Sequence, residues 1–391
     1  MGKAPSVGAV GLLLCLLACG EAVPAEPFSV RDSAGVRVVE NRSPLREGES
    51  GWRIDTLPLF TLGGALEPMD GFVREDGGVV VLDRMLPGLL FYDAEGHLIR
   101  RVGRKGDGPG EFASPERVFR YRGDSLGTFD ARHRRIDIRT AEGAFVRSVL
   151  VRVGLSRLTF LGQFSDGSFV FGGERFEAEG PRWRAPLEVL RIEPSGEGSE
   201  TIGEYPGREF YRIVFEGRPI FGVTPFGPDA LVSVHDSILA VHFRMNCDVE
   251  VRGEEGTLRT LQGSPCQRRA LEEGHIEAFR QERVSRMRSE DLRDWGDRLF
   301  RSRHVPYPHR IPPFKRLLHD SEGNLWVEVY PLAGDAGRRW WVFRGDGRWL
   351  SELNVPYPHE LQWVGRDRVL VLVTGEEGVG RIQIHSLQKE E

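Results

Sequence analysis

The chain has 391 residues, a formal net charge of −5, and 28 % charged and 40 % hydrophobic residues. Removal of an N-terminal leader that carries Lys3 takes the mature charge to −5 − 1 = −6. A mildly acidic chain without a basic stripe argues against nucleic-acid binding.

The first 18 residues predict a signal peptide. Lys3 precedes an apolar stretch from Val7 to Ala18, which is shorter than the ~20 residues of a membrane-spanning helix. The ending Leu16-Leu17-Ala18-Cys19 resembles a bacterial lipobox. We therefore expect lipidation of Cys19 and an exported protein anchored to the cell envelope, at the outer membrane or on the periplasmic side. Cleavage near residues 23–25, which would give a soluble secreted protein, is the alternative.

Residues 19–31 are expected to form a tether, and residues 32–391 the folded body. The segment VRVVEN at 36–41 alternates weakly. It predicts a strand that either adds to the outside of a sheet or lies across the sheets.

A repeat of short apolar strands organises the body. Its first strand begins after an Asp- or Gly-containing turn at six places: Val79, Leu126, Phe169, Ile238, Leu325 and Val369. Three of the five spacings (47, 43 and 44 residues) match the ~40–50 residues of a four-stranded propeller blade, and two (69 and 87) indicate a blade with an insertion. The sequence therefore predicts an all-β, six-bladed β-propeller.

The second hairpin of the repeat is missing from the last copy. Five copies have a turn that ends in glycine, at Gly96, Gly143, Gly196, Gly256 and Gly347, but the segment at 380–387 has no following strand. Because a propeller avoids exposed edges by closing on itself, we expect residues 52–63 to pair with 380–386. An independent N-terminal hairpin is the alternative.

Several residues are candidates for capping or cross-linking. Asp83 and Asp130 end equivalent strands and are predicted to cap the turns that follow; a paired-carboxylate site is the competing interpretation. Cys247 and Cys266 form an even pair in an exported chain, which predicts a disulfide.

Residues 267–303 break the strand pattern. Apolar residues recur there at helical spacing, and Ser289 followed by two acidic residues predicts a helix N-cap. We therefore expect a helical insertion before blade five. The segments HVPYPHRIPPF at 304–314 and VPYPHEL at 355–361 resemble each other, which suggests that His309 and His359 are neighbours; a shared structural connector is the plainer interpretation.

The connector GRKGDGPGEFASPERV at 103–118 resembles the NHL-type repeat. The segments DSAGVRVVEN at 32–41, GNLWVEVY at 323–330 and DGRWL at 346–350 also resemble a family of bacterial exported six-bladed β-propeller proteins. The resemblance implies the same fold and an exported lipoprotein. It implies little about activity, because propellers host many functions.

The expected function is a binding or scaffold module for a peptide, glycan or protein partner. No nucleophile elbow, zinc motif, phosphate-binding loop or dinucleotide fingerprint occurs. The segments expected to line the channel are poor in metal ligands: 72–75, 118–122, 160–164, 230–234, 314–318 and 362–365. We therefore predict no catalytic residue, cofactor or metal, and a monomer that meets the membrane through its lipid anchor alone. A channel-based hydrolase or lyase, similar to lactonases, is the alternative.

Overall fold

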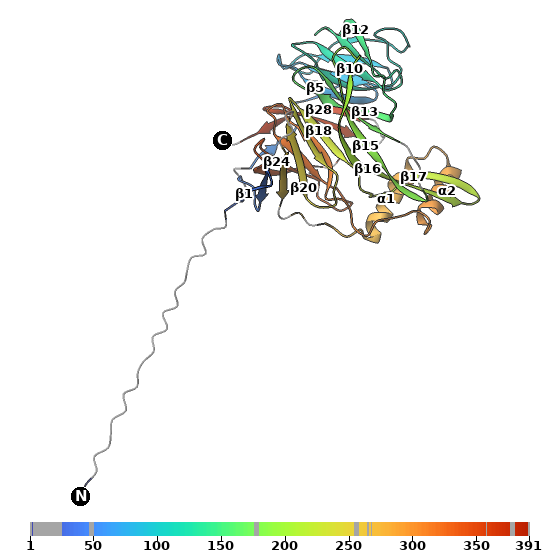
Figure 1. Cartoon of the computed structure of the whole chain (residues 1–391). Coiled ribbons are helices and arrows are strands. Elements are labelled where there is room, and N and C mark those ends of the chain that lie inside the picture. Colours follow the sequence, from blue (N-terminus) through green and yellow to red (C-terminus); the bar gives the residue numbers. More distant parts are fainter. Residues whose placement is uncertain are drawn as a thin grey trace.

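The computed structural model describes Gly2 and residues 26–46, 51–175, 180–253, 258–263, 266, 268–356, 358–375 and 380–389, without the side chains of 258–263. The described chain is all-β apart from two helices, and its strands form six sheets, antiparallel except for one parallel pair, in a propeller-like arrangement (Figure 1). Cys19 and the predicted signal peptide lie outside the described residues, apart from Gly2.

The first three sheets follow one another along the chain. Sheet one holds β5 (Pro68–Val73), β6 (Val79–Asp83), β7 (Gly88–Tyr92) and β8 (Leu98–Val102). Sheet two holds β9 (Pro115–Arg120), β10 (Leu126–Asp130), β11 (Arg135–Arg139) and β12 (Phe145–Leu150). Sheet three holds β13 (Ser156–Gln163), β14 (Phe169–Glu174), β15 (Arg182–Ile192), β16 (Ser199–Phe215) and β17 (Arg218–Val223).

The other three sheets include strands from the N-terminal segment. Sheet four holds β18 (Leu231–His235), β19 (Ile238–His242), β20 (Asp248–Gly253) and β21 (Leu258–Gly263), extended by β2 (Val36–Asn41) and β1 (Phe28–Ser33). Sheet five holds β22 (Phe314–His319), β23 (Leu325–Val329), β24 (Arg338–Phe343) and β25 (Trp349–Val355). Sheet six holds β26 (His359–Val364), β27 (Arg368–Thr374) and β28 (Gly380–Gln388), beside β3 (Arg53–Ile54) and β4 (Phe60–Leu62).

The repeat read from the sequence marks the second strand of every sheet. Strands β6, β10, β14, β19 and β23 begin at the predicted residues, and β27 begins one residue before Val369. All five residues of β6 and of β10 are buried, because sheets cover both of their faces. The first strands of neighbouring sheets also touch: β5 contacts β9 and β26, and β18 contacts β13 and β22.

The N-terminal segment is folded from an earlier point than expected. Strand β1 begins at Phe28, inside the segment predicted as a tether, and Phe28 packs against the core between sheets four and five. Strand β2 runs parallel to β21, so it adds to the outside of sheet four, one of the two expected positions. Asn41 ties it to sheet five, donating to the Gly347 carbonyl (3.0 Å) and accepting from the Trp349 amide (2.9 Å).

Strands β3 and β4 pair with the last strand, β28. Leu62 lies opposite Ile382 and Phe60 opposite Ile384, and Ile54 lies opposite Leu387. The pairing predicted between residues 52–63 and 380–386 is therefore present. It gives β28 a neighbour on the side away from β27.

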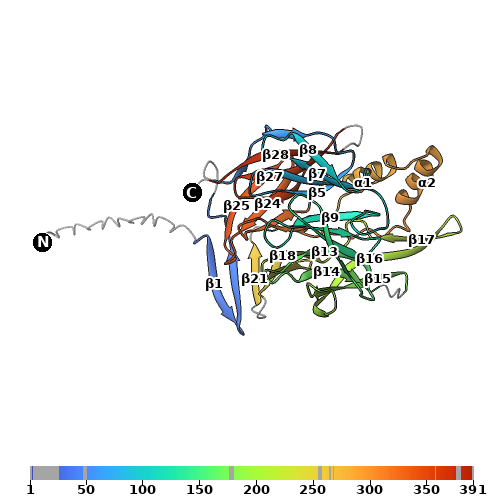
Figure 2. The same cartoon turned by 90° about the horizontal axis from the view of Figure 1, so that it is seen from above.

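Two insertions far apart in the sequence form one lobe. The helical insertion contains α1 (Glu273–Ser285) and α2 (Glu290–Arg301), and Ser289 caps α2 as predicted by accepting from the Leu292 amide. Both helices lie beside the hairpin of β16 and β17 (Figures 1 and 2). Their apolar side chains share a cluster with Tyr211 on β16, and Arg298 pairs with Glu216 at 2.9 Å. Neither helix of the described chain is long and apolar enough to span a membrane.

Candidate functional site

The two mature cysteines of the described chain form a disulfide. Cys247 and Cys266 are bonded, with their Cα atoms 5.9 Å apart. Both pack against the apolar cluster between sheets four and five. This position indicates a stabilising role at the end of sheet four.

Asp83 and Asp130 hold backbone turns together. The Asp83 carboxylate accepts from the amides of Leu66 (2.8 Å), Met85 (3.0 Å) and Leu86 (3.2 Å). Asp130 accepts in the same way from Ala113 (2.7 Å), Ser114 (3.0 Å) and His133 (3.0 Å). The capping interpretation is confirmed, and these carboxylates are occupied by structural contacts.

Strands β5, β9, β13 and β26 begin three or four residues before the predicted segments, which adds Asp70 and Arg117 to the inner strands. Asp70 on β5 accepts from the Val118 amide of sheet two (3.0 Å) and lies 3.7 Å from Arg117. Burial raises the pKa of Asp70, while Arg117 opposes that shift. Gln163 donates to the Arg120 carbonyl (2.7 Å), and Arg316 donates to the Leu361 carbonyl of sheet six.

These three contacts have a common form. In each, a side chain of one inner strand binds a backbone group of the inner strand in a neighbouring sheet. Such contacts satisfy polar groups that burial would otherwise leave unpaired. They hold adjacent sheets together.

Four histidines of the described chain lie in two pairs. Ser233 and His319 are joined by a 2.8 Å hydrogen bond, and the His319 ring stacks on His235 with centroids 5.6 Å apart. Burial and the neighbouring His235 lower the pKa of His319 to about 3. The hollow beside His319 measures about 10 Å³, which is room for roughly one water molecule.

The two similar segments fit the plainer interpretation, a shared structural connector, and not a pairing of His309 with His359. His359 instead faces His385 of β28, with ring centroids 5.4 Å apart, and His385 donates from Nδ1 to the Asp55 carbonyl (2.8 Å). The His309 carbonyl accepts from the Leu271 amide. The similar sequences at 304–314 and 355–361 therefore do not bring their histidines together.

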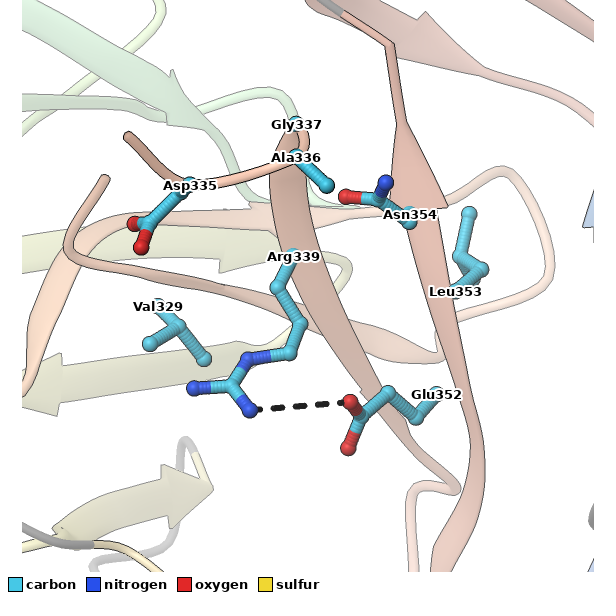
Figure 3. Close-up of a pocket in the computed structure, with 8 residues that line it drawn as sticks. All are labelled: Val329, Asp335, Ala336, Gly337, Arg339, Glu352, Leu353 and Asn354. Atoms are coloured by element: carbon cyan, nitrogen blue, oxygen red, sulfur yellow. Dashed lines mark ion pairs between the residues drawn. The ribbon is translucent and has the colours of Figure 1, made fainter. Parts of the chain in front are cut away.

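A larger hollow lies on the face of sheet five. It measures about 450 Å³ and is lined by Val329, Asp335, Ala336, Gly337, Arg339, Glu352, Leu353 and Asn354 (Figure 3). Arg339 lies opposite Asn354 and Trp341 lies opposite Glu352 in the β24–β25 pairing, so these four side chains share one face of the sheet.

A small hollow of mixed polar and apolar lining adjoins the large one. It measures about 20 Å³ and is lined by Cys266, Arg269, Ile311, Pro312, Pro313, Val329, Arg339 and Trp341. Val329 and Arg339 line both hollows. We call the two together the sheet-five groove.

The acidic groups of the sheet-five groove already have partners. Asp335 accepts from Arg269 through both oxygens (2.8 and 3.0 Å) and from the Leu332 amide (2.8 Å). Glu352 accepts from the Trp341 indole N–H (2.9 Å). Both carboxylates are thus fixed in position by hydrogen bonds.

Arg339 differs from these groups. Its side chain is 48 % exposed and lies 3.8 Å from Glu352, too far for a hydrogen bond (Figure 3). In the part of the chain that the structure describes, Arg339 makes no shorter ion pair and no side-chain hydrogen bond. Its five N–H donors are therefore open to a ligand.

The wall opposite Arg339 is closely packed. A Cβ atom on Gly337 would come within 2.7 Å of the Asn354 amide and of the Val355 carbonyl. Glycine at this position allows the Asn354 side chain to lie against the loop, where it borders the large hollow.

Among the described residues, no three His, Cys, Asp or Glu side chains are grouped so that they could hold a metal ion.

These features define an all-β protein of propeller-like sheets with an amphipathic groove on one sheet face. No known protein family matches the chain, and no curated protein does. Among solved structures, it is similar to a member of the DUF4221 family from Bacteroides vulgatus, at 12 % identity and a TM-score of 0.50, over 87 % of this chain and 99 % of that one. An identity this low describes a shared fold alone.

Two further structures are more distant in shape. A protein from Bacteroides fragilis described as a candidate exported protein has 13 % identity and a TM-score of 0.49, over 90 % of this chain and 99 % of that one. Virginiamycin B lyase from Staphylococcus aureus has 10 % identity and a TM-score of 0.39, over 85 % and 88 %. At these TM-scores neither is evidence for an activity of the present chain.

Proposed function

We propose that the six sheets are the blades of one β-propeller of NHL type, closed by the N-terminal strands. The contacts of β5 with both β9 and β26 support a ring, because they join the first sheet to the second and to the last. The pairing of β4 with β28 supports closure by the N-terminal segment. Closure of this kind covers the edge of the last blade and keeps the ring rigid.

We infer that the propeller is a binding module and that its ligand enters the sheet-five groove. The observation that carries this proposal is the state of Arg339, a half-exposed guanidinium with open donors that lines both hollows of the groove. A concave site with a few fixed polar groups is the usual form of a ligand site. The expected ligands are a peptide, a glycan or a segment of a partner protein.

The protein is proposed to act outside the cytoplasm, attached to the cell envelope through a lipid on Cys19. The apolar leader followed by Leu-Leu-Ala-Cys19 supports export and lipidation. The bond between Cys247 and Cys266 supports an oxidising compartment.

The binding role is tested on peptide and glycan arrays, with the mature protein and two variants. Asn354→Trp fills the large hollow, and Val146→Trp makes the same change at an exposed position of β12, in another sheet. We expect the mature protein and Val146→Trp to bind the same array members, and Asn354→Trp to lose them. Binding that survives Asn354→Trp would refute a role for the groove.

The enzyme alternative has a separate test. Hydrolysis of ester or lactone substrates that a chelator abolishes and that Asn354→Trp leaves intact would favour a channel-based hydrolase. The binding proposal predicts no such turnover.

A further inference from the structure

The sheet-five groove has features that narrow the chemistry of its ligand. Its two acids are held by Arg269, Leu332 and Trp341, so Arg339 is the charged group of the groove with open donors among the described residues. A planar guanidinium binds a carboxylate through two parallel hydrogen bonds. The polar part of the groove therefore favours a ligand that carries a carboxylate.

The small hollow limits the size of the group that lies next to that carboxylate. Ile311, Pro312 and Trp341 provide its apolar lining, Arg269 and Arg339 its charged lining, and its volume of about 20 Å³ accepts a group of roughly the size of one water or one methyl group. Because Arg339 lines both hollows, the carboxylate and the small apolar group must be close together in the ligand.

A peptide C-terminus meets this condition. Its last residue carries a carboxylate and a side chain on the same Cα atom, whereas an acidic side chain has no apolar branch beside its carboxylate. The preceding peptide backbone would lie in the large hollow, where Asn354 offers both a donor and an acceptor. Trp341 is only 3 % exposed, so it leaves no open ring face on which a sugar can stack.

We propose that the sheet-five groove binds the C-terminal carboxylate of a peptide that ends in a small apolar residue such as alanine. This inference rests on the proposed function and adds the ligand class. Arg339 holds the carboxylate, the last side chain enters the small hollow against Ile311, Pro312 and Trp341, and the rest of the peptide extends past Asn354. Capture of a terminal carboxylate is a known form of peptide recognition.

The charge of Glu352 is expected to weaken binding of the ligand. Its carboxylate lies 3.8 Å from Arg339 and would repel the carboxylate of the ligand. Replacing Glu352 with glutamine removes this negative charge and keeps an oxygen that accepts from Trp341. The two variants Arg339→Gln and Glu352→Gln should therefore change affinity in opposite directions.

The test uses calorimetric titration of the mature protein with three probes: acetyl-Gly-Gly-Ala as the free acid, its C-terminal amide, and acetyl-Gly-Gly-Leu as the free acid. We expect the alanine acid to bind roughly tenfold or more tightly than the other two probes. Arg339→Gln should abolish the preference for acid over amide, and Glu352→Gln should increase it. Thermal melts verify that both variants fold, and Arg339→Lys provides a second variant that keeps the charge but loses the paired hydrogen bonds.

Equal binding of the acid and the amide, or a preference that survives Arg339→Gln, would overturn the inference. So would binding of the leucine probe as tightly as the alanine probe. If array ligands need an open groove but none of the three probes binds, the ligand class is wrong and the binding function stands. If no array member responds to Asn354→Trp, the proposed function fails as well.

Discussion

The pairing of β4 with β28 makes a quantitative prediction about stability. Leu62 on β4 is 4 % exposed and packs in the cluster that includes Leu90 of sheet one and Ile382 of sheet six. Replacing a buried leucine with alanine typically costs about 2–5 kcal/mol. Because β4 is only three residues long and can shift to fill the space, we expect Leu62→Ala to cost about 2–3 kcal/mol.

The control lies five residues away in the same segment. Leu57 is 80 % exposed, so Leu57→Ala should change the free energy of unfolding by no more than about 0.5 kcal/mol. The assay is urea unfolding of the mature protein and both variants, followed by tryptophan fluorescence. If Leu62→Ala and Leu57→Ala unfold at the same urea concentration, residues 60–62 do not stabilise the fold through β28, and closure by this segment is refuted.

Three further predictions concern pH, the disulfide and the anchor. Burial lowers the pKa of His319 to about 3, so below about pH 6.5 the unfolded chain takes up a proton that the folded chain does not. At pH 5 this difference costs about 2 kcal/mol of stability. The variant His319→Asn should therefore lose less stability as the pH falls, and a loss equal to that of the parent would contradict this. Mass spectrometry of the unreduced protein should find Cys247 linked to Cys266, and reduction should cost about 3 kcal/mol, whereas two alkylatable thiols would rule the bond out. Cys19→Ala should release the protein from membranes; a variant that still fractionates with them has no lipid anchor at this residue.

The sequence predicts strands well where burial is complete. The starts of β6, β10, β14, β19 and β23 are correct because each strand follows a turn residue and then opens on an apolar side chain in a largely buried stretch. The first strands were placed less accurately. Asp70 and Arg117 interrupt the apolar pattern there. They are polar because Asp70 binds the Val118 amide of the next sheet and lies beside Arg117.

The helical insertion was predicted from its local signals. Ser289 caps α2 with its own side chain, an interaction that is encoded within a few residues. The lobe was not predicted, because it requires β16 and β17 to meet helices that follow more than forty residues later. A local sequence pattern does not encode a contact between segments this far apart in the chain.

The sheet-five groove is not predicted by the sequence either. Asp335, Arg339, Glu352 and Asn354 belong to no motif, and they meet because β24 and β25 are adjacent and in this register. One signal was present. The connection between β23 and β24 spans residues 330–337, eight residues, against the four of 84–87 between β6 and β7. Longer connections more often carry function, although the connection of 103–114 between β8 and β9 is longer still.

The proposal that the sheet-five groove is the ligand site is tested most directly by hydrogen–deuterium exchange. The mature protein is measured with and without the tightest-binding array member, at a ligand concentration that saturates it. We expect slower exchange in residues 332–341 and 349–355, with little change in β5, β9 and β22. Protection of those inner strands, with the groove unchanged, would place the ligand at the centre of the sheets and contradict a ligand site in the groove.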